Sequence, residues 1–486
     1  MANKHLTLAA TIAALATLSG CVTTGGPRLD IVGPRGGSQP VIASLSSGPY
    51  QPSSEAIGVD KDVDANRVQG MGLVPAPELE AYLNDRLEAI RGAVGITGMP
   101  GSVHITANPG LKANTTPDGN MFISMGWIQN LENEDQVMAL LGHEFCHAAF
   151  KHHDSDIAGK VGRRLHDAGA IVAAIQNQLD TKGQAQGLTA GAQKNLGKVQ
   201  LLIMITEQVI VPAWNRNQET ECDRFSTDLA VKMGYSLDVG MSSFLDKIKA
   251  WDSSVEASRK SDLQQLSQQQ KNDPNAVLQT GLKQLLDGLK VDHPDTDDRI
   301  KDIAAYREKY YPDALPVKAR KESWQKVVGK GQTKTILANY KATFEVEDLI
   351  RQRQVKEALV KGKTAVSGPT ADHALPLYRY ALALDAAGES KKAGEMFERS
   401  TRAKEPALPP YADRARYLES TGQPAKALEV METAYKRFNE PPNLMPQLIG
   451  LYRKNGKKDE QNKLFMSCRF KNPEYGDQCA QANNPT

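Results

Sequence analysis

Hydrophobic and polar positions between residues 76 and 150 follow two different periods. Apolar residues first recur three and four positions apart, which predicts an amphipathic helix that ends near Gly92: Leu79, Tyr82, Leu83, Leu87 and Ile90. Two short apolar runs, 102–107 and 120–126, are separated by turn residues and predict strands. A helical pattern returns over residues 134–150. The pattern predicts a small α+β domain, mostly α with a small β-sheet.

A longer period begins in the C-terminal third of the chain. Glycines recur 34 residues apart at Gly388, Gly422 and Gly456. Other columns keep the same register: Leu384, Leu418 and Tyr452; Ala381, Ala415 and Ile449; Phe397, Met431 and Phe465. The period and the turn glycine resemble tetratricopeptide repeats, which are helix–turn–helix units. Residues 336–470 are therefore predicted to form an α-solenoid, whose concave surface would bind segments of other proteins.

Length and composition agree with several folded domains. The chain has 486 residues, whereas one domain takes about 150, and 40% of its residues are hydrophobic. Lys and Arg number 59 against 57 Asp and Glu, so the net charge of +2 offers no surplus for binding nucleic acid. No apolar run reaches the length of about 18 residues that a membrane span requires. The five cysteines form no CxxC pair, which argues against zinc ribbons and thioredoxin-like redox centres.

The first 20 residues have the pattern of a targeting segment. Lys4 precedes an apolar run over residues 6–18, and small residues stand directly before Cys21. This resembles a lipobox, which implies removal of residues 1–20 and lipidation of Cys21; the alternative is an ordinary secretory signal with an incidental cysteine. In bacterial lipoproteins the residue after the lipidated cysteine governs sorting, and Val22 at this position, rather than Asp, favours the outer membrane. We expect a periplasmic protein that its N-terminal lipid anchors to the membrane.

The helix predicted over residues 134–150 contains His143-Glu144-Phe145-Cys146-His147. Residues four apart lie on one face of a helix, so His143 and His147 can bind one metal ion. Glu144 is rotated away from that face and can act as a general base toward water on the ion. The HExxH pattern therefore predicts a catalytic zinc site, with a surface helix carrying two histidines as the alternative.

A catalytic zinc requires a third protein ligand, and two candidates compete for this position. His153 stands where a metzincin has its third histidine, but Phe150 replaces the glycine of that motif. Glu219 and Asp223 share a helix face, so one can bind the metal while the other orients a histidine. We favour Glu219, which leaves His152 and His153 as solvated residues or partners of the ligands.

These features resemble the zinc metallopeptidase family of CAAX prenyl endopeptidases and HtpX. The resemblance covers about residues 76–305 and rests on five motifs: a strand-and-glycine segment at 114–128, Glu134, the HExxH, Glu219 with Asp223, and His293-Pro294 with Arg299. It implies a zincin domain with one Zn²⁺ per chain. The implied roles are the following: His143, His147 and Glu219 as ligands, Glu144 as base, and Asp223 beside a ligand.

The last motif suggests two further catalytic candidates. In BepA-like relatives a histidine at this position can approach the zinc as a movable fourth ligand, which would make His293 a latency switch. The alternative is that His293 packs at a helix start, where Pro294 suits the first turn. Arg299 could bind a substrate carbonyl or tie the domain together by a salt bridge. Without transmembrane helices, the chain is nearest to BepA-like periplasmic lipoprotein proteases.

Four cysteines remain after Cys21. Cys146 and Cys222 lie inside the two ligand motifs, and we expect them to be buried and free, with a bridge or redox control as the alternative. Cys468 and Cys479 follow the last repeat and are expected to form a disulfide in an oxidising compartment.

The resulting organisation is as follows: signal peptide 1–20, lipidated Cys21 and flexible tether 21–75, metallopeptidase domain 76–310, linker 311–335, repeats 336–470 and tail 471–486. Residues 251–291 are a lid or a plain surface insertion. The resemblance implies an endopeptidase for misassembled outer-membrane β-barrel proteins, which the repeats would recruit together with their assembly machinery. The alternatives are a chaperone or adaptor with a latent zinc site, and a scaffold with a structural metal.

Overall fold

The computed structural model describes residues 38–69, 72–154, 216–268 and 296–484. The predictions for the signal peptide, for Cys21 and for His293 lie outside the described residues, as does most of the expected lid at 251–291. The chain divides into residues 1–35 and residues 36–486, and the fold below is that of the second unit.

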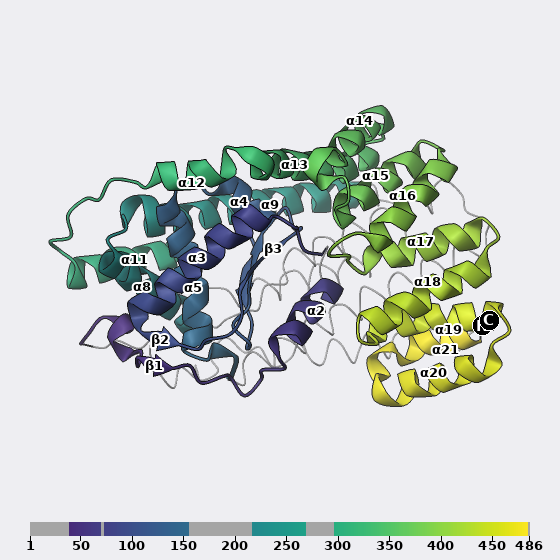
Figure 1. Cartoon of the computed structure of the whole chain (residues 1–486), viewed down its shortest axis with the longest axis horizontal. Helices are drawn as coiled ribbons and strands as arrows, with labels where there is room; N and C mark the ends of the chain where they lie inside the picture. The colour runs from purple at the N-terminus through teal and green to yellow at the C-terminus, as the bar shows by residue number, and fades with distance from the viewer. Residues whose placement is uncertain (1–37, 70–71, 155–215, 269–295, 485–486) are drawn as a thin grey trace. The chain divides into compact units, whose positions relative to one another are not determined.

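The part of this unit up to residue 310 is mainly helical and contains two small sheets (Figure 1). Strands β3 (Val103–Thr106) and β5 (Met121–Ser124) pair in parallel, and β4 (Ala113–Thr115) pairs with β5 in the antiparallel direction. The order β3-β5-β4 makes β4 an edge strand. A second parallel pair joins β1 (Gly48–Pro49) to β2 (Ile96–Thr97).

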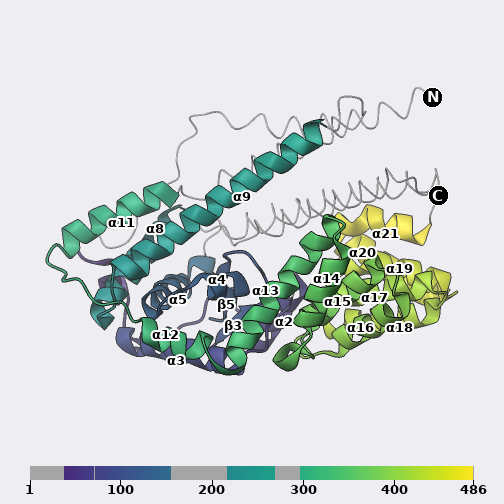
Figure 2. The same ribbon diagram turned by 90° about the horizontal axis from the view of Figure 1, so that it is seen from above.

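Helices pack around these strands. Their bounds are α2 (Val59–Gln69), α3 (Pro77–Val94), α4 (Met125–Asn130), α5 (Glu134–Ala149), α8 (Arg216–Met233), α9 (Ser243–Gln268) and α11 (Thr296–Tyr310), with short turns η2 (Val41–Ser44), η3 (His152–Asp154) and η4 (Asp238–Ser242). Helix α11 packs against α8 and α9 (Figure 2). The amphipathic pattern before Gly92 corresponds to α3, whose apolar face is buried. Among the described residues, no helix is long and apolar enough to cross a membrane.

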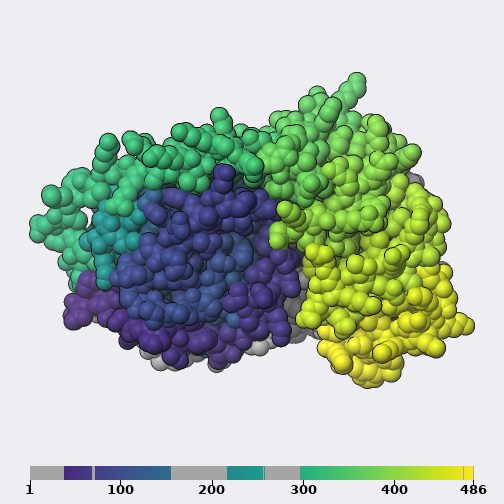
Figure 3. Space-filling view, viewed as in Figure 1, coloured from purple at the N-terminus to yellow at the C-terminus, as the bar shows by residue number. Residues whose placement is uncertain are grey.

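The structure differs from the flexible tether predicted for residues 21–75, because the residues that it describes there include η2, β1 and α2. Val41 is fully buried, and its backbone nitrogen donates a hydrogen bond to Tyr306 Oη at 2.8 Å. The neighbouring backbone nitrogen of Ile42 donates to Asp228 Oδ2 at 2.9 Å. This segment, purple in Figure 3, lies at the surface of the peptidase part. Its anchors are single contacts to distant residues, which leave no periodic pattern in the sequence.

The linker predicted for residues 311–335 is also partly helical. It contains α12 (Lys321–Val328), whose Trp324 is fully buried and donates from Nε1 to the Leu131 carbonyl at 2.8 Å. The remaining helices are α13 (Gly331–Arg351), α14 (Val355–Ala365), α15 (Ala374–Ala386), α16 (Ser390–Arg402), α17 (Pro409–Ser420), α18 (Pro424–Arg437), α19 (Met445–Lys454), α20 (Lys458–Lys471) and α21 (Gly476–Asn483), with short turns η5 (Gly368–Thr370), η6 (Pro442–Leu444) and η7 (Pro473–Tyr475). The predicted tail is thus helical for most of its length.

The 34-residue period corresponds to three packed helix pairs, α15 with α16, α17 with α18, and α19 with α20. Gly388, Gly422 and Gly456 lie between the two helices of each pair and have φ values of 76°, 74° and 71°. Only glycine adopts this left-handed conformation at little cost, which explains the spacing of the three residues. The column of Ala381, Ala415 and Ile449 is fully buried.

Candidate metal centre

Two helices supply the side chains of the centre. Helix α5 begins after Asn133, whose Oδ1 accepts a hydrogen bond from the Gln136 nitrogen at 2.9 Å. Helix α8 packs closely against it at Gly142, where a Cβ atom would lie 3.0 Å from Leu229 Cδ2 and Ser226 Oγ. The absence of a side chain at this position lets the two helices approach each other, and so brings their polar faces together.

Three predicted ligands converge between these helices. Nε2 of His143 lies 3.2 Å from Nε2 of His147. The carboxylate of Glu219 spans both rings, with Oε2 at 3.6 Å from His143 Nε2 and Oε1 at 3.6 Å from His147 Nε2. Donor atoms around a four-coordinate zinc are roughly 3.3 Å apart, since each lies about 2.0–2.2 Å from the ion. The spacing of the two nitrogens and the carboxylate therefore fits a zinc ion.

Asp223 and Arg299 hold the first ligand in place. Asp223 Oδ1 lies 2.9 Å from Nδ1 of His143, and Arg299 donates two hydrogen bonds of 2.7 Å to the same carboxylate. Arg299 also forms an ion pair of 3.0 Å with Glu219. Burial alone would raise the pKa of Asp223, but Arg299 and His143 outweigh it and lower that pKa to about 2. The structure thus places Arg299 in the salt bridge that was one of its two predicted roles.

Glu144 follows His143 on α5, and its carboxylate is not part of the group of ligand atoms. Its Oε2 accepts a hydrogen bond of 2.9 Å from Thr115 Oγ1 on the edge strand β4. Burial raises the pKa of Glu144 to about 7, against which His143 and Thr115 act only in part. A carboxylate with a pKa close to the working pH is well suited to general base catalysis.

Comparison with known proteins identifies the part of the chain that carries this centre. Residues 77–307 match the model of Peptidase family M48. Over 246 residues the chain is 28% identical to the metalloprotease YcaL of Escherichia coli (strain K12), which covers 49% of this chain and 83% of YcaL. Over 74 residues it is 27% identical to the mitochondrial metalloendopeptidase OMA1 of Bos taurus, which covers 15% of this chain and 14% of OMA1. These matches support a metallopeptidase function.

The family match ends before the helix pairs. Peptidases of family M48 use a metal ion, typically zinc. The three buried ligand atoms described above provide a site for such an ion.

The second ligand, His147, is supported by His152, which thereby takes one of its two predicted roles, that of a partner of the ligands. Nδ1 of His147 lies 2.9 Å from Nδ1 of His152, and Nε2 of His152 lies 2.9 Å from Glu221 Oε2. Both partners are buried, so His152 is not a solvated residue. Glu221 adjoins the predicted Glu219, but the sequence offers no sign that its side chain points back toward the same centre.

His153 does not take the role of third ligand. Its Nε2 donates a hydrogen bond of 2.7 Å to the backbone carbonyl of Thr115. His153 does not belong to the group of ligand atoms that His143, His147 and Glu219 form. Burial lowers the pKa of His153 to about 4. Because Nε2 of His153 is hydrogen-bonded to a carbonyl, it is not available as the third metal ligand that the metzincin spacing had suggested.

The expectation of free cysteines in the two motifs is wrong. Cys146 and Cys222 form a disulfide between α5 and α8, with 5.3 Å between their Cα atoms. Because these residues are 76 positions apart in the sequence, only the packing of the two helices brings them together. The structure also pairs Cys468 with Cys479, whose Cα atoms are 6.6 Å apart.

Proposed function

We propose that the chain is a zinc-dependent endopeptidase of the bacterial cell envelope. The observation that carries the proposal is the spacing of His143, His147 and Glu219, with Glu144 directly beside them. A zinc ion at this position would polarise a peptide carbonyl and lower the pKa of a water molecule.

Each buried side chain then has a defined task. Glu144 accepts a proton from the attacking water and returns it to the leaving amine. Thr115 holds the Oε2 atom of this carboxylate by its hydroxyl group. Asp223 accepts a hydrogen bond from His143 and so directs the opposite ring nitrogen toward the ligand site. In this proposal Glu144 transfers protons, whereas Asp223 orients the ligand His143.

A cleavage assay tests the proposal. The chain from Val22 onward, which retains every described residue, is mixed with an unfolded outer-membrane β-barrel protein, and its zinc content is measured in parallel. We expect Glu144→Gln to retain zinc and lose cleavage, and Glu219→Ala to lose zinc. His153→Ala serves as the control and should retain zinc. Full zinc occupancy in Glu219→Ala would overturn the ligand assignment.

The location and the clients are further parts of this proposal. Lipidation at Cys21 would anchor the protein to the outer membrane, where a BepA-like protease would meet misassembled β-barrel proteins and their assembly machinery. The helix pairs would recruit these clients as tetratricopeptide repeats do. His293 remains the proposed latency switch, and His293→Ala would then cleave faster than the unmodified chain in the same assay.

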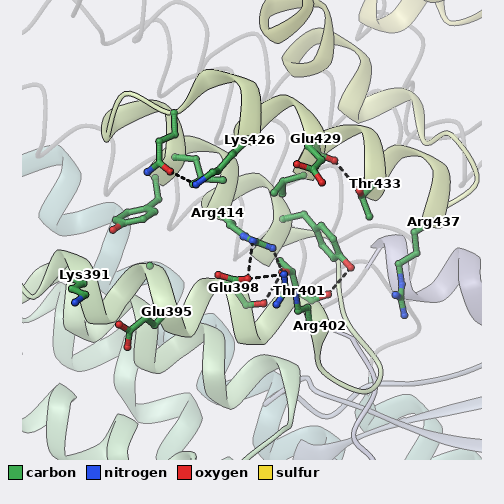
Figure 4. A pocket seen from close by; sticks show the side chains of 16 residues that line it. Lys391, Glu395, Glu398, Thr401, Arg402, Arg414, Lys426, Glu429, Thr433 and Arg437 are labelled. Atoms are coloured by element: carbon green, nitrogen blue, oxygen red, sulfur yellow. Dashed lines mark hydrogen bonds and ion pairs between the residues drawn. The ribbon is translucent and has the colours of Figure 1, made fainter.

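A groove in the repeat part supports recruitment of other polypeptides. It has a volume of about 790 Å³ and lies between α16, α17 and α18 (Figure 4). Its two outer helices carry the same order of charges, Lys391, Glu395 and Arg402 on α16, and Lys426, Glu429 and Arg437 on α18. Tyr411, Arg414 and Tyr417 from α17 also line it. Charged and aromatic groups of this kind can bind an extended segment of a partner protein.

The same groove favours a second candidate function, that of a chaperone or assembly adaptor. In that case the chain from Val22 would suppress aggregation of an unfolded β-barrel protein, and Glu144→Gln would do so equally well. Zinc-loaded protein that cleaves nothing, even as His293→Ala, would move the conclusion to this second function.

A further inference from the structure

We propose that the Cys146–Cys222 disulfide is a positioning cross-link that holds Glu219 in ligating range and so determines how firmly the protein retains its metal ion. The inference rests on the proposed zinc site and extends it to two residues to which no role in metal binding has been assigned.

Both sulfur atoms belong to the helical turns that carry the ligands. Cys146 immediately precedes His147 on α5, and Cys222 lies between Glu219 and Asp223 on α8. Residues three or four positions apart lie within one turn of a helix, so each cysteine shares a turn with a metal-binding side chain. The cross-link therefore joins the turns that must remain at a fixed distance.

The cross-link acts on the part of α8 that carries Glu219. Glu219 is only three positions before Cys222, and its carboxylate faces both histidines of α5. Two packing contacts of α8 with α5 lie further along the helix, where Ser226 Oγ donates to the Ala139 carbonyl at 2.8 Å and Phe225 stacks on Phe145. Cys222 is closer to Glu219 than either of these contacts, so its covalent bond restrains the end of α8 that carries the ligand.

The disulfide also lies against the support of the second ligand. Cys222 Sγ is 3.8 Å from Nδ1 of His152, the nitrogen that faces His147. Both cysteines are fully buried. Loss of the cross-link would therefore loosen the carboxylate ligand and the ring that orients His147, while the contacts at Phe225 and Ser226 would keep the helices packed.

The test compares two double variants of the chain from Val22 onward. Cys146→Ala/Cys222→Ala removes the cross-link without leaving a thiol that could bind metal. The matched control, Cys468→Ala/Cys479→Ala, removes the other disulfide, whose residues belong to the C-terminal helices α20 and α21. Zinc dissociation into a chromogenic chelator is measured for each, together with the absorption spectrum of the Co²⁺-loaded form, which reports the ligand geometry.

We expect zinc to leave the first variant about tenfold faster or more, the size of effect that loss of support for a ligand usually has. Its Co²⁺ spectrum should change, while the control variant keeps the rate and spectrum of the unmodified chain. Equal rates in all three proteins would overturn the proposal, and so would equal acceleration in both variants, because that would indicate general destabilisation.

Two further measurements keep the result interpretable. If the first variant does not fold, Cys146→Ala/Cys222→Val, which fills more of the space left by the sulfurs, is measured against the same control and judged by the same criteria. Zinc that binds stoichiometrically without any cleavage would refute the endopeptidase and leave the cross-link test valid. An unmodified chain that binds no zinc would overturn both proposals.

Discussion

At the scale of single residues, the centre is a set of buried charges that depend on one another. Asp223 is 1% exposed and Arg299 is 8% exposed, and together with Glu219 they form a compact group of two carboxylates and one guanidinium. Removing one member of such a group leaves the others charged and without compensation in a site that excludes water. The same group holds His143, so its integrity matters for both folding and metal binding.

Arg299→Ala should therefore be strongly destabilising. We expect the free energy of unfolding to fall by about 3–5 kcal/mol, because two buried carboxylates lose their cation. Arg224→Ala is a matched control, since Arg224 and Asp302 join the same helices α8 and α11 through a pair that is 22% and 28% exposed. Loss of that pair should have an effect of only about 1 kcal/mol. Urea unfolding with a chelator present compares them, and equal losses would contradict this account.

At the scale of elements, the apolar period predicted most of what positions the site. The helices α3 and α5 follow from the helical spacing of apolar residues, and β3 and β5 follow from short apolar runs. The turn glycines of the helix pairs follow from their 34-residue spacing. The strand β4 was not predicted, because three residues on an edge carry no period.

The remaining errors have a common physical cause, which is dependence on tertiary contacts. The segment before Ala76 is held by single hydrogen bonds to Tyr306 and Asp228, which the sequence does not reveal. Likewise, Glu221 and the Cys146–Cys222 bridge become recognisable only when α5 and α8 are packed. The two histidines could be predicted because their spacing within one helix is itself the signal, whereas the residues that contact them come from other elements.

The contact between α5 and α8 gives a prediction at this scale. Gly142→Ala places a Cβ atom 3.0 Å from Leu229 and Ser226, so we expect α8 to shift and the free energy of unfolding to fall by about 1–3 kcal/mol. Zinc affinity should fall as well, since Glu219 moves with α8. The control is Gly92→Ala in α3, where no atom lies within 4 Å and the change should be neutral or stabilising by up to about 1 kcal/mol. An unchanged zinc affinity in Gly142→Ala would contradict the proposed coupling.

At the scale of the whole molecule, the buried apolar side chains do not divide where the family match ends. One cluster extends from Val41 through the peptidase part to Phe397, so it includes α12, α13, α15 and α16. A second cluster begins at Leu408 and ends at Leu451. We therefore expect the first helix pair to unfold with the peptidase part and the later pairs to unfold separately.

Removal of zinc should reveal this division. A ligand that binds only the folded state stabilises it by about 2.7 kcal/mol at a free concentration one hundred times its Kd, and this applies only to the unit that contains the site. Of the four tryptophans, Trp127 and Trp324 belong to the first apolar cluster, and none lies within the residue range of the second cluster. Tryptophan fluorescence therefore reports on the first cluster, whereas far-ultraviolet circular dichroism reports on all helices. We expect a chelator to lower the midpoint temperature of the unfolding transition seen by fluorescence. A second transition, seen only by circular dichroism and due to the later helix pairs, should keep its midpoint.

The variant Glu219→Ala provides the control for this experiment, because a chain without the carboxylate ligand should unfold at the same temperature with and without chelator. A chelator that shifted both transitions of the unmodified chain equally would show that the two apolar clusters unfold as one cooperative unit. The boundary between the two apolar clusters, between Phe397 and Leu408, would then not separate two units of unfolding. The metal would stabilise the later helix pairs through the first pair. Separate transitions, by contrast, would allow the groove between α16, α17 and α18, which lie on both sides of this boundary, to rearrange while the metal centre remains folded.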